Sequence, residues 1–246
     1  MSDVEVVIKG EVHHSVPDLK HEMEILQEGV DFLVLEKSEE ESNFHIRYIW
    51  FHALMWALNS FFFRFIYTST DVLEEITESE GGHIRKTRKS DIEIVQNAPL
   101  REELFALSIF LILIILAIYL GVFQSAVEWV GIGSFISSAL IPPLLLREQE
   151  SNRDDKNRDK EIADIIAEAM EDGERIVAVV GGKHVDNIQT FLPEWVEPEI
   201  YDPKFDWYHP RLWPRLLLAI FVLIFTYGAI YLSLILAIKT ALIVVL

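Results

Sequence analysis

The stretch Arg175-Ile-Val-Ala-Val-Val-Gly-Gly-Lys-His-Val-Asp-Asn-Ile188 decides the fold of this chain. Its residues 176–180 are β-branched or small and apolar, a pattern typical of a short strand that is buried on both faces. The run ends at two glycines, and His184 follows them closely. Because ligands bind at the carboxyl ends of the strands in open α/β sheets, the sequence predicts that His184 lies at a binding edge.

The same arrangement occurs once more near the N-terminus, in Val4-Glu-Val-Val-Ile-Lys-Gly-Glu-Val-His-His-Ser15. Each stretch reads as a strand followed by Gly-x-x-His, which gives Gly10 with His13 and Gly181 with His184. The glycine allows a sharp turn, so that the side chain three positions later points back over the sheet edge. One such pattern recurs by chance, but two copies in one chain predict two imidazoles that converge on one site.

A carboxylate is predicted at the same edge. Residues 19–27 carry apolar side chains at helical spacing, and residues 32–35 form a second strand that ends at Glu36. In a parallel β-α-β unit the ends of both strands lie on one edge. Two imidazoles and a carboxylate are a ligand set that catalytic metal sites use. We therefore predict that His13, His184 and Glu36 bind a divalent ion (Zn, Mn, Co or Fe), or that Glu36 acts instead as the general base. Each residue taken alone is more often a structural or solvated group.

The composition narrows the class of protein. Acidic residues outnumber basic ones 39 to 21, which gives a net charge of −18, although 51% of the residues are hydrophobic. Such an acidic surface argues against nucleic acid and anionic lipid as partners. There are no cysteines, which excludes disulfides and thiolate chemistry. The N-terminal residues lack the pattern of a cleavable signal peptide, so we expect the first domain to begin in the cytoplasm.

The hydrophobic residues are concentrated in a few segments. Residues 104–123 and 216–238 contain no charged side chain, and each is long enough to cross about 30 Å of hydrocarbon as a helix. Residues 130–146 are uncharged as well and predict the second helix of a transmembrane hairpin. The aromatic run at 48–63 is short and contains His52 and Asn59, so a buried or interfacial helix is favoured over a crossing.

The expected topology follows from the predicted site. His13 and His184 can share a site only if the chain between them crosses the membrane an even number of times. Basic residues at 85–89, 147–160 and 211–215 flank the three spans, which predicts a cytoplasmic α/β domain and an outside C-terminus. Gly131-x-Gly133 and the neighbouring serines would permit close helix packing or a homo-oligomer. The predicted organisation is residues 1–100 and 147–203 for the two parts of the α/β domain, 101–146 for the hairpin, 204–215 for an interfacial linker and 216–246 for the last transmembrane helix.

Four segments, taken together, resemble a known family. Val7-Ile-Lys-Gly-Glu-Val-His-His-Ser15, Asp31-Phe-Leu-Val-Leu-Glu36, Asn157-Arg-Asp159 and Val177-Ala-Val-Val-Gly-Gly-Lys-His-Val185 look like the successive motifs of the TraB/PrgY family. That family is related to the Tiki metalloproteases and to the erythromycin esterase and ChaN-type proteins. The resemblance covers about residues 4–40 and 152–192. It implies an α/β fold with a mixed or parallel sheet flanked by helices, here with an inserted transmembrane hairpin and a C-terminal transmembrane helix.

The resemblance also implies roles for individual residues. It marks Gly10, His13, Glu36, Arg158, Gly181 and His184 as site residues, in which Arg158 would stabilise negative charge or anchor an acidic group of the substrate. We expect His14 and Asp159 to support the ligands from behind. The arginine that the family usually carries shortly after the glutamate is missing, since Glu36 is followed by Lys37-Ser38 and three glutamates.

Two functions are therefore expected. The first is a membrane-anchored, metal-dependent hydrolase that cuts a peptide or similar bond at the cytoplasmic face of the membrane, as in the Tiki proteins. The second is a non-enzymatic regulator that binds a peptide or small ligand, as is suggested for pheromone-shutdown members of the family. A transporter is disfavoured, because the predicted spans contain almost none of the ionisable residues that an ion path needs.

Overall fold

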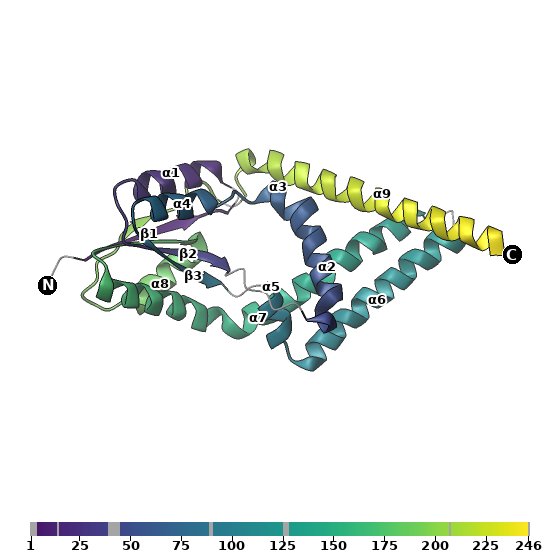
Figure 1. Cartoon of the computed structure of the whole chain (residues 1–246), viewed down its shortest axis with the longest axis horizontal. Coiled ribbons are helices and arrows are strands. Elements are labelled where there is room, and N and C mark those ends of the chain that lie inside the picture. Colours follow the sequence, from purple (N-terminus) through teal and green to yellow (C-terminus); the bar gives the residue numbers. More distant parts are fainter. Residues whose placement is uncertain are drawn as a thin grey trace. The chain divides into compact units, whose positions relative to one another are not determined.

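The computed structural model describes residues 4–13, 15–38, 45–88, 91–124, 128–206 and 208–245. The chain forms two compact units (Figure 1). The first unit comprises Met1–Glu41, Ile66–Ser90 and Asp154–Arg215, and the second comprises Ser42–Phe65, Asp91–Arg153 and Leu216–Leu246. The first unit is an α/β domain, and the second consists of long apolar helices.

The first unit is built on a five-stranded sheet in the order β3-β2-β4-β1-β5. Every pairing is parallel. The predicted central strand is β4, which pairs with β1 on one side and with β2 on the other. This confirms the predicted α/β class, although β1 and β2 are separated by β4. The strands are β1 (Glu5–Glu11), β2 (Phe32–Ser38), β3 (His83–Arg88), β4 (Arg175–Gly181) and β5 (Glu199–Tyr201).

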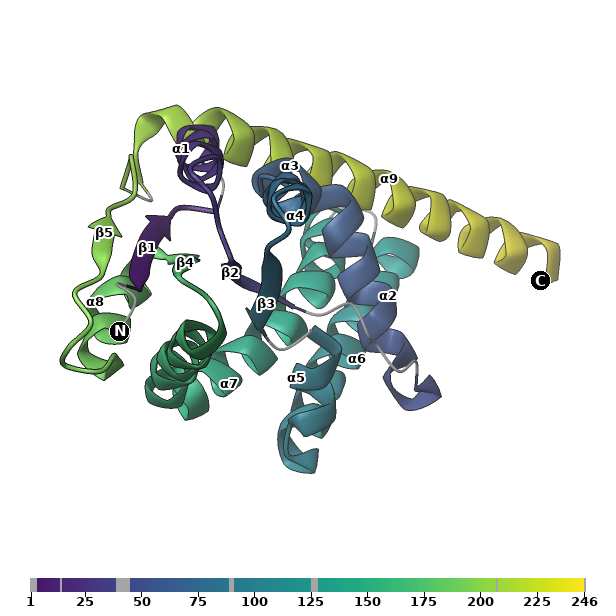
Figure 2. The same ribbon diagram turned by 60° about the vertical axis from the view of Figure 1, so that its left-hand side comes forward.

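Both faces of the sheet are covered by helices, as the apolar strands predict. Side chains alternate along each strand, so that Val6 and Ile8 pack on one face and Val7 packs on the other. The face that carries Val7 is covered by α1 (Val16–Leu26) and α4 (Asp71–Ser79) (Figure 2). The opposite face is covered by the C-terminal part of α7 (Glu128–Asp172) and by α8 (Val185–Phe191). Helix α1 begins as predicted, because the Ser15 hydroxyl accepts a hydrogen bond from the Asp18 N–H.

Two strands lie where the sequence indicated none. Strand β3 occupies the basic segment His-Ile-Arg-Lys-Thr-Arg, and β5 lies just before the predicted interfacial linker at 204–215. Both are edge strands, at opposite ends of the sheet. An edge strand needs only one paired side and carries charged residues readily, so the continuous apolar run that identifies a buried strand is absent from it.

Among the described residues, four helices, which lie mainly in the second unit, are long and apolar enough to cross a membrane: Ile46–Ile66, Leu100–Phe123, Glu128–Glu150 and Pro210–Val244. The last three match the predicted hairpin, α6 (Leu100–Phe123) with α7, and the predicted final helix, α9 (Trp213–Val245) after the 3-10 turn η5 (Pro210–Leu212). The first consists of the 3-10 turn η1 (Ile46–Tyr48), α2 (Ile49–Leu58), the π-helical turn η2 (Asn59–Phe63) and α3 (Arg64–Ile66). A short helix, α5 (Asp91–Asn97), precedes α6.

Helix α7 is longer than the sequence suggested. It runs without interruption through Pro142 and Pro143 and through the charged stretch that follows them. We expected the apolar part to end near residue 146 and a separate helix to begin near residue 157. The charged residues between them are good helix formers, so one helix joins the apolar part to the sheet-covering part.

Tyr231 packs into a notch formed by Gly121 of α6 and Gly131 of α7, where three long helices of the second unit meet. The Tyr231 hydroxyl of α9 donates a hydrogen bond of 2.9 Å to the Ala117 carbonyl of α6. A methyl group on Gly121 or on Gly131 would lie 2.3 Å or 2.0 Å from the Tyr231 oxygen. Gly131 therefore serves packing within the chain, whereas Gly133 has nothing within 4 Å.

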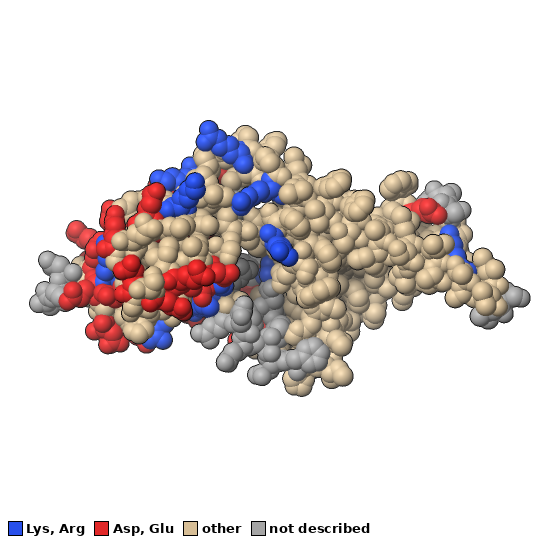
Figure 3. All heavy atoms as spheres, turned by 45° about the horizontal axis from the view of Figure 1, so that its top comes forward, with Lys and Arg blue, Asp and Glu red and all other residues tan. Residues whose placement is uncertain are grey.

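The two units differ sharply in surface charge. Acidic side chains crowd the surface of the α/β unit, while the long helices are almost bare of charge (Figure 3). Large apolar side chains such as Leu111, Phe221 and Phe225 are exposed along these helices. Exposed apolar surface of this extent marks a protein–protein or membrane interaction site, and the length of these helices suits a membrane.

Candidate functional site

Three of the predicted site residues converge at the carboxyl edge of the sheet. Strands β1 and β4 are in register with Glu11 opposite Gly181, so His13 and His184 both follow strand ends at this edge. A methyl group on Gly181 would lie 3.2 Å from Glu36 Oε2, 3.5 Å from His184 Cδ2 and 3.9 Å from His13 Nε2. The two Gly-x-x-His copies and the carboxylate of β2 thus surround one small space beside Gly181.

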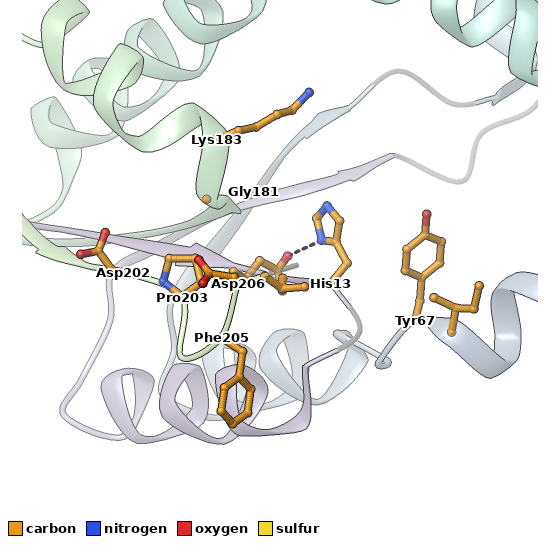
Figure 4. Close-up of a pocket in the computed structure, with 12 residues that line it drawn as sticks. His13, Tyr67, Gly181, Lys183, Asp202, Pro203, Phe205 and Asp206 are labelled. Carbon is orange, nitrogen blue, oxygen red and sulfur yellow. Dashed lines mark hydrogen bonds and ion pairs between the residues drawn. The ribbon is translucent and has the colours of Figure 1, made fainter. Parts of the chain in front are cut away.

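His13 is held from two directions. Its Nδ1 lies 2.7 Å from Glu11 Oε1 (Figure 4), and its side chain is 34% exposed. The His13 carbonyl accepts hydrogen bonds from the Thr68 N–H at 3.0 Å and from the Thr68 hydroxyl at 2.9 Å. The Tyr67 ring meets the imidazole edge-on, with 5.9 Å between the ring centroids. These contacts fix the imidazole with Nε2 toward Gly181.

His184 is buried and has a carboxylate partner of its own. Its Nδ1 lies 2.5 Å from Asp159 Oδ1 on α7. The other Asp159 oxygen accepts a hydrogen bond of 2.8 Å from the Asn187 amide. His184 Nε2 is buried and has no hydrogen-bond partner among the described residues. Asp159 therefore lies where a supporting residue was expected.

Both imidazoles share one pattern. In each ring, Nδ1 lies beside a carboxylate, and the atom closest to the Cβ position of Gly181 is Nε2 in His13 and Cδ2 in His184. Histidines that bind metals in proteins usually have their second ring nitrogen held by a carboxylate, a carbonyl or water in this way. The orphaned, buried Nε2 of His184 needs a partner, because an unpaired buried polar atom is costly. The pattern suits a ligand-binding role for the pair.

Glu36 lies within β2 instead of following it, because the strand continues to Ser38. One of its oxygens is paired with the Arg158 guanidinium, and the other accepts a hydrogen bond of 2.8 Å from the Gly181 N–H. Burial acts to raise the pKa of Glu36, but Arg158, the Gly181 N–H and the two imidazoles outweigh it and hold the pKa below its usual value. Glu36 is therefore ionised at neutral pH.

The types of side chain at this site suit a divalent ion, but the side chains are not arranged as a complete metal site. Two imidazoles and a carboxylate are suitable ligands, and each imidazole is oriented as a ligand would be. In the described part of the chain, however, no three His, Asp or Glu side chains are arranged as a metal site. Both Glu36 oxygens are engaged, one by Arg158 and the other by the Gly181 N–H. The two imidazoles are thus the residues that would hold an ion.

A cavity of about 800 Å³ opens beside His13. Its wall comes from residues 11–13, 66–67, 181–183 and 202–206, and Figure 4 shows His13 between Tyr67 and the 202–206 loop. A smaller cavity of about 170 Å³ is also lined by His13, together with Glu36. The larger volume is in the range of pockets that bind small molecules.

A buried ion pair anchors the loop of the cavity wall. Lys9 and Asp18 are both fully buried, with 2.9 Å between Lys9 Nζ and Asp18 Oδ1. Lys9 Nζ also donates to the Asp202 carbonyl at 3.2 Å, and Asp18 Oδ1 accepts from the Lys204 N–H at 2.7 Å. Breaking a buried pair of this kind costs about 3–5 kcal/mol, so this wall has a fixed shape.

Sequence reasoning missed some residues of the site. Glu11 is the last residue of β1, two positions before His13, so its closeness to His13 in the sequence was the available signal. Asn187 lies three residues after His184. Tyr67 and Thr68 carry no such signal, because only the path of the chain brings them to His13. His14 lies outside the described residues.

No protein-family model, no curated protein and no solved structure matches this chain.

Proposed function

We propose that this chain is a membrane-anchored hydrolase that binds a divalent ion through His13 and His184 and cuts a peptide or a similar bond. The observation that carries the proposal is the paired orientation of the two imidazoles: each has Nδ1 beside a carboxylate, and each has the opposite side of its ring near Gly181, through Nε2 of His13 and Cδ2 of His184. The resemblance to the TraB/PrgY and Tiki proteins supports the same chemistry. A bound divalent ion would lower the pKa of a water molecule and polarise the carbonyl of the scissile bond.

The residues of the chain would then divide the work. Glu36 is ionised and lies next to both imidazoles, so it would accept a proton from the attacking water and pass it to the leaving amine. Arg158 keeps Glu36 charged, and its Nε is buried without a hydrogen-bond partner among the described residues. That N–H is a donor for the negative charge that develops on the substrate oxygen.

The substrate would enter through the cavity beside His13. The cavity wall presents Phe205 and Tyr67 together with Asp202, Asp206 and Lys183. This mixture of aromatic and charged groups suits a short peptide better than a purely apolar ligand.

A regulator that binds a peptide without cutting it is the second candidate. The engagement of both Glu36 oxygens favours it, because a committed carboxylate can neither complete a metal site nor act as a base until it is released. The cavity and its anchored wall would serve binding equally well.

Metal content separates the two candidates. The full-length protein, purified in detergent and stripped of loose ions, is loaded with Zn, Mn, Co or Fe and analysed by mass spectrometry. We expect about one ion per chain in the wild type, loss of that ion in His13→Ala and His184→Ala, and full retention in His83→Ala, whose histidine lies on the edge strand β3. Hydrolysis of quenched fluorescent peptides should follow metal content. Equal, negligible metal in the wild type and in all variants would overturn the hydrolase and leave the regulator.

A further inference from the structure

Helix Ile46–Ile66 is long and apolar enough to cross a membrane, but the pairing of the strands before and after it is incompatible with a single crossing. The helix follows β2 in the chain and precedes β3, and these two strands are hydrogen-bonded neighbours. If the helix crossed the bilayer once, β2 and β3 would lie on opposite sides of it. The helix must therefore begin and end on the same side.

The contacts of the helix within the second unit agree with this. Near its N-terminal end, Arg47 Nε donates a hydrogen bond of 3.0 Å to Glu103 Oε1, in the first turn of α6. Near its C-terminal end, Arg147 of α7 lies over the Phe63 ring, at 5.5 Å from the centroid. Because α6 and α7 form a hairpin, the start of α6 and residue 147 of α7 belong to the same end of that hairpin. Both ends of the helix are therefore at one membrane surface.

The helix packs between these ends on one face only. Phe51, Leu54, Met55 and Leu58 are buried in a cluster with residues of three other helices, namely Ala106 of α6, Ala139 and Leu146 of α7, and Leu223 and Tyr227 of α9. The other face is apolar as well but uncovered. Ile49 is 54% exposed and Trp56 is 67% exposed. A helix that is apolar all round needs an apolar solvent on its free side.

We propose that helix Ile46–Ile66 lies in the plane of the membrane, at the level where the spanning helices enter it, with Ile49 and Trp56 in contact with lipid. Trp is enriched at this depth of the bilayer, and Arg47 and Arg64 at the helix ends can reach the head groups. Helices α6 and α9 also carry exposed apolar side chains, as contact with the same bilayer would require.

This placement has a consequence for the candidate site. The helix ends at Ile66, and Ile66 and Tyr67 line the cavity beside His13. Chain connectivity thus keeps one wall of the cavity within a few residues of the membrane surface. The inference itself does not depend on the proposed hydrolase activity.

The absence of native cysteines makes the proposal testable with single cysteine variants. Glu24→Cys on α1 and Glu78→Cys on α4 lie on either side of the helix in the chain, and Ala241→Cys lies near the end of α9; all three positions are exposed. A membrane-impermeant maleimide is applied to intact cells and to inverted vesicles. We expect positions 24 and 78 to react from the same side and position 241 from the opposite side. Labelling of 24 and 78 from opposite sides would overturn the proposal.

Lipid contact needs a second measurement. Trp56→Cys, Leu116→Cys in the middle of α6 and Glu78→Cys are labelled with an environment-sensitive fluorophore in phosphatidylcholine vesicles that carry shallow or deep spin-labelled lipids. We expect position 56 to be quenched more by the shallow label, position 116 more by the deep label and position 78 by neither. Equal protection of 56 and 78 would mean that water, another protein or a second copy covers this face, and preferential deep quenching at 56 would mean that the helix dips into the core. Either result contradicts the proposal.

Discussion

At the scale of single residues, the site is a set of polar groups whose partners already fix their charge and direction. Glu11 and Asp159 orient the two imidazoles, and Arg158 keeps Glu36 ionised. A methyl group on Gly181 would lie within 4 Å of Glu36 and of both imidazoles. The space beside Gly181 is the feature that a ligand needs, and a methyl group is enough to occupy it.

Gly181→Ala is therefore expected to weaken ion binding without unfolding the protein. Gly181 has φ −58° and ψ 134°, a conformation that alanine adopts without strain. The new methyl group would lie 3.2 Å from Glu36 Oε2, where the carboxylate can shift slightly. We expect ion affinity to fall at least about tenfold, measured by calorimetric titration of the purified protein. Gly133→Ala is the matched control, because nothing lies within 4 Å of that position. Unchanged affinity in Gly181→Ala would place the ligand elsewhere.

A second residue-scale prediction concerns Glu22. Glu22 is fully buried beside Lys9 and Asp18, and neither of its oxygens has a hydrogen-bond partner among the described residues. Burial, together with the charge of Glu11, raises the pKa of Glu22 to about 8 from an ordinary 4.5. In the unfolded chain Glu22 ionises first as the pH rises, so this group lowers the free energy of unfolding progressively between about pH 4.5 and pH 8.

Glu22→Gln should remove that slope. We expect the wild type to lose stability on the order of 3 kcal/mol from this group between pH 5 and pH 8, while the variant remains flatter over the same range. Thermal unfolding in detergent at a series of pH values measures the difference, and Glu24→Gln, at an exposed position of the same helix, is the control. Parallel pH profiles for wild type and Glu22→Gln would show that Glu22 is ionised in the folded protein.

At the scale of elements, the buried central strands were predictable from the sequence, and the edge strands were not. Strands β1 and β4 could be recognised because both of their faces are apolar, and the glycines after them pointed to the two imidazoles. The edge strands β3 and β5 carry no such pattern. The helix at 46–66 was visible as an apolar run, but whether it crosses depends on the pairing of β2 with β3. That pairing is a contact between distant residues, which no local pattern contains.

The packing of α6, α7 and α9 gives a prediction at the same scale. Gly131→Ala would place a methyl group 2.0 Å from the Tyr231 oxygen, so the helices must separate or the tyrosine must move. We expect a loss of about 1–3 kcal/mol, read as a lower unfolding temperature in detergent. The double variant Gly131→Ala with Tyr231→Phe should recover part of this loss, because the clashing oxygen is gone. Gly133→Ala should behave as the wild type, and equal losses in both glycine variants would contradict the notch.

At the scale of the whole molecule, the acidic α/β unit and the apolar helical unit are interleaved along one chain. Composition alone showed that an excess of acidic residues coexists with a hydrophobic majority, and the uncharged runs located the apolar part. The two parts of the chain that precede and follow the hairpin form one sheet. This was predictable from His13 and His184, because both histidines had to lie at the same edge of a sheet. The supporting groups Tyr67 and Thr68 were not predictable, because their position results from the return of the chain after the helix at 46–66.

The strand order has a consequence for biogenesis. Strand β1 pairs only with β4 and β5 in the described sheet, and both follow the hairpin in the chain. When the first half of the polypeptide leaves the ribosome, β2 and β3 can associate, but β1 has no strand neighbour in the described sheet until β4 has been synthesised, at residue 181. The sheet can therefore be completed only after α6 and most of α7 have been synthesised. A hairpin that inserted into a membrane with only one pass would leave β4 on the other side of the bilayer from β1, so the sheet can form only when the hairpin has inserted correctly.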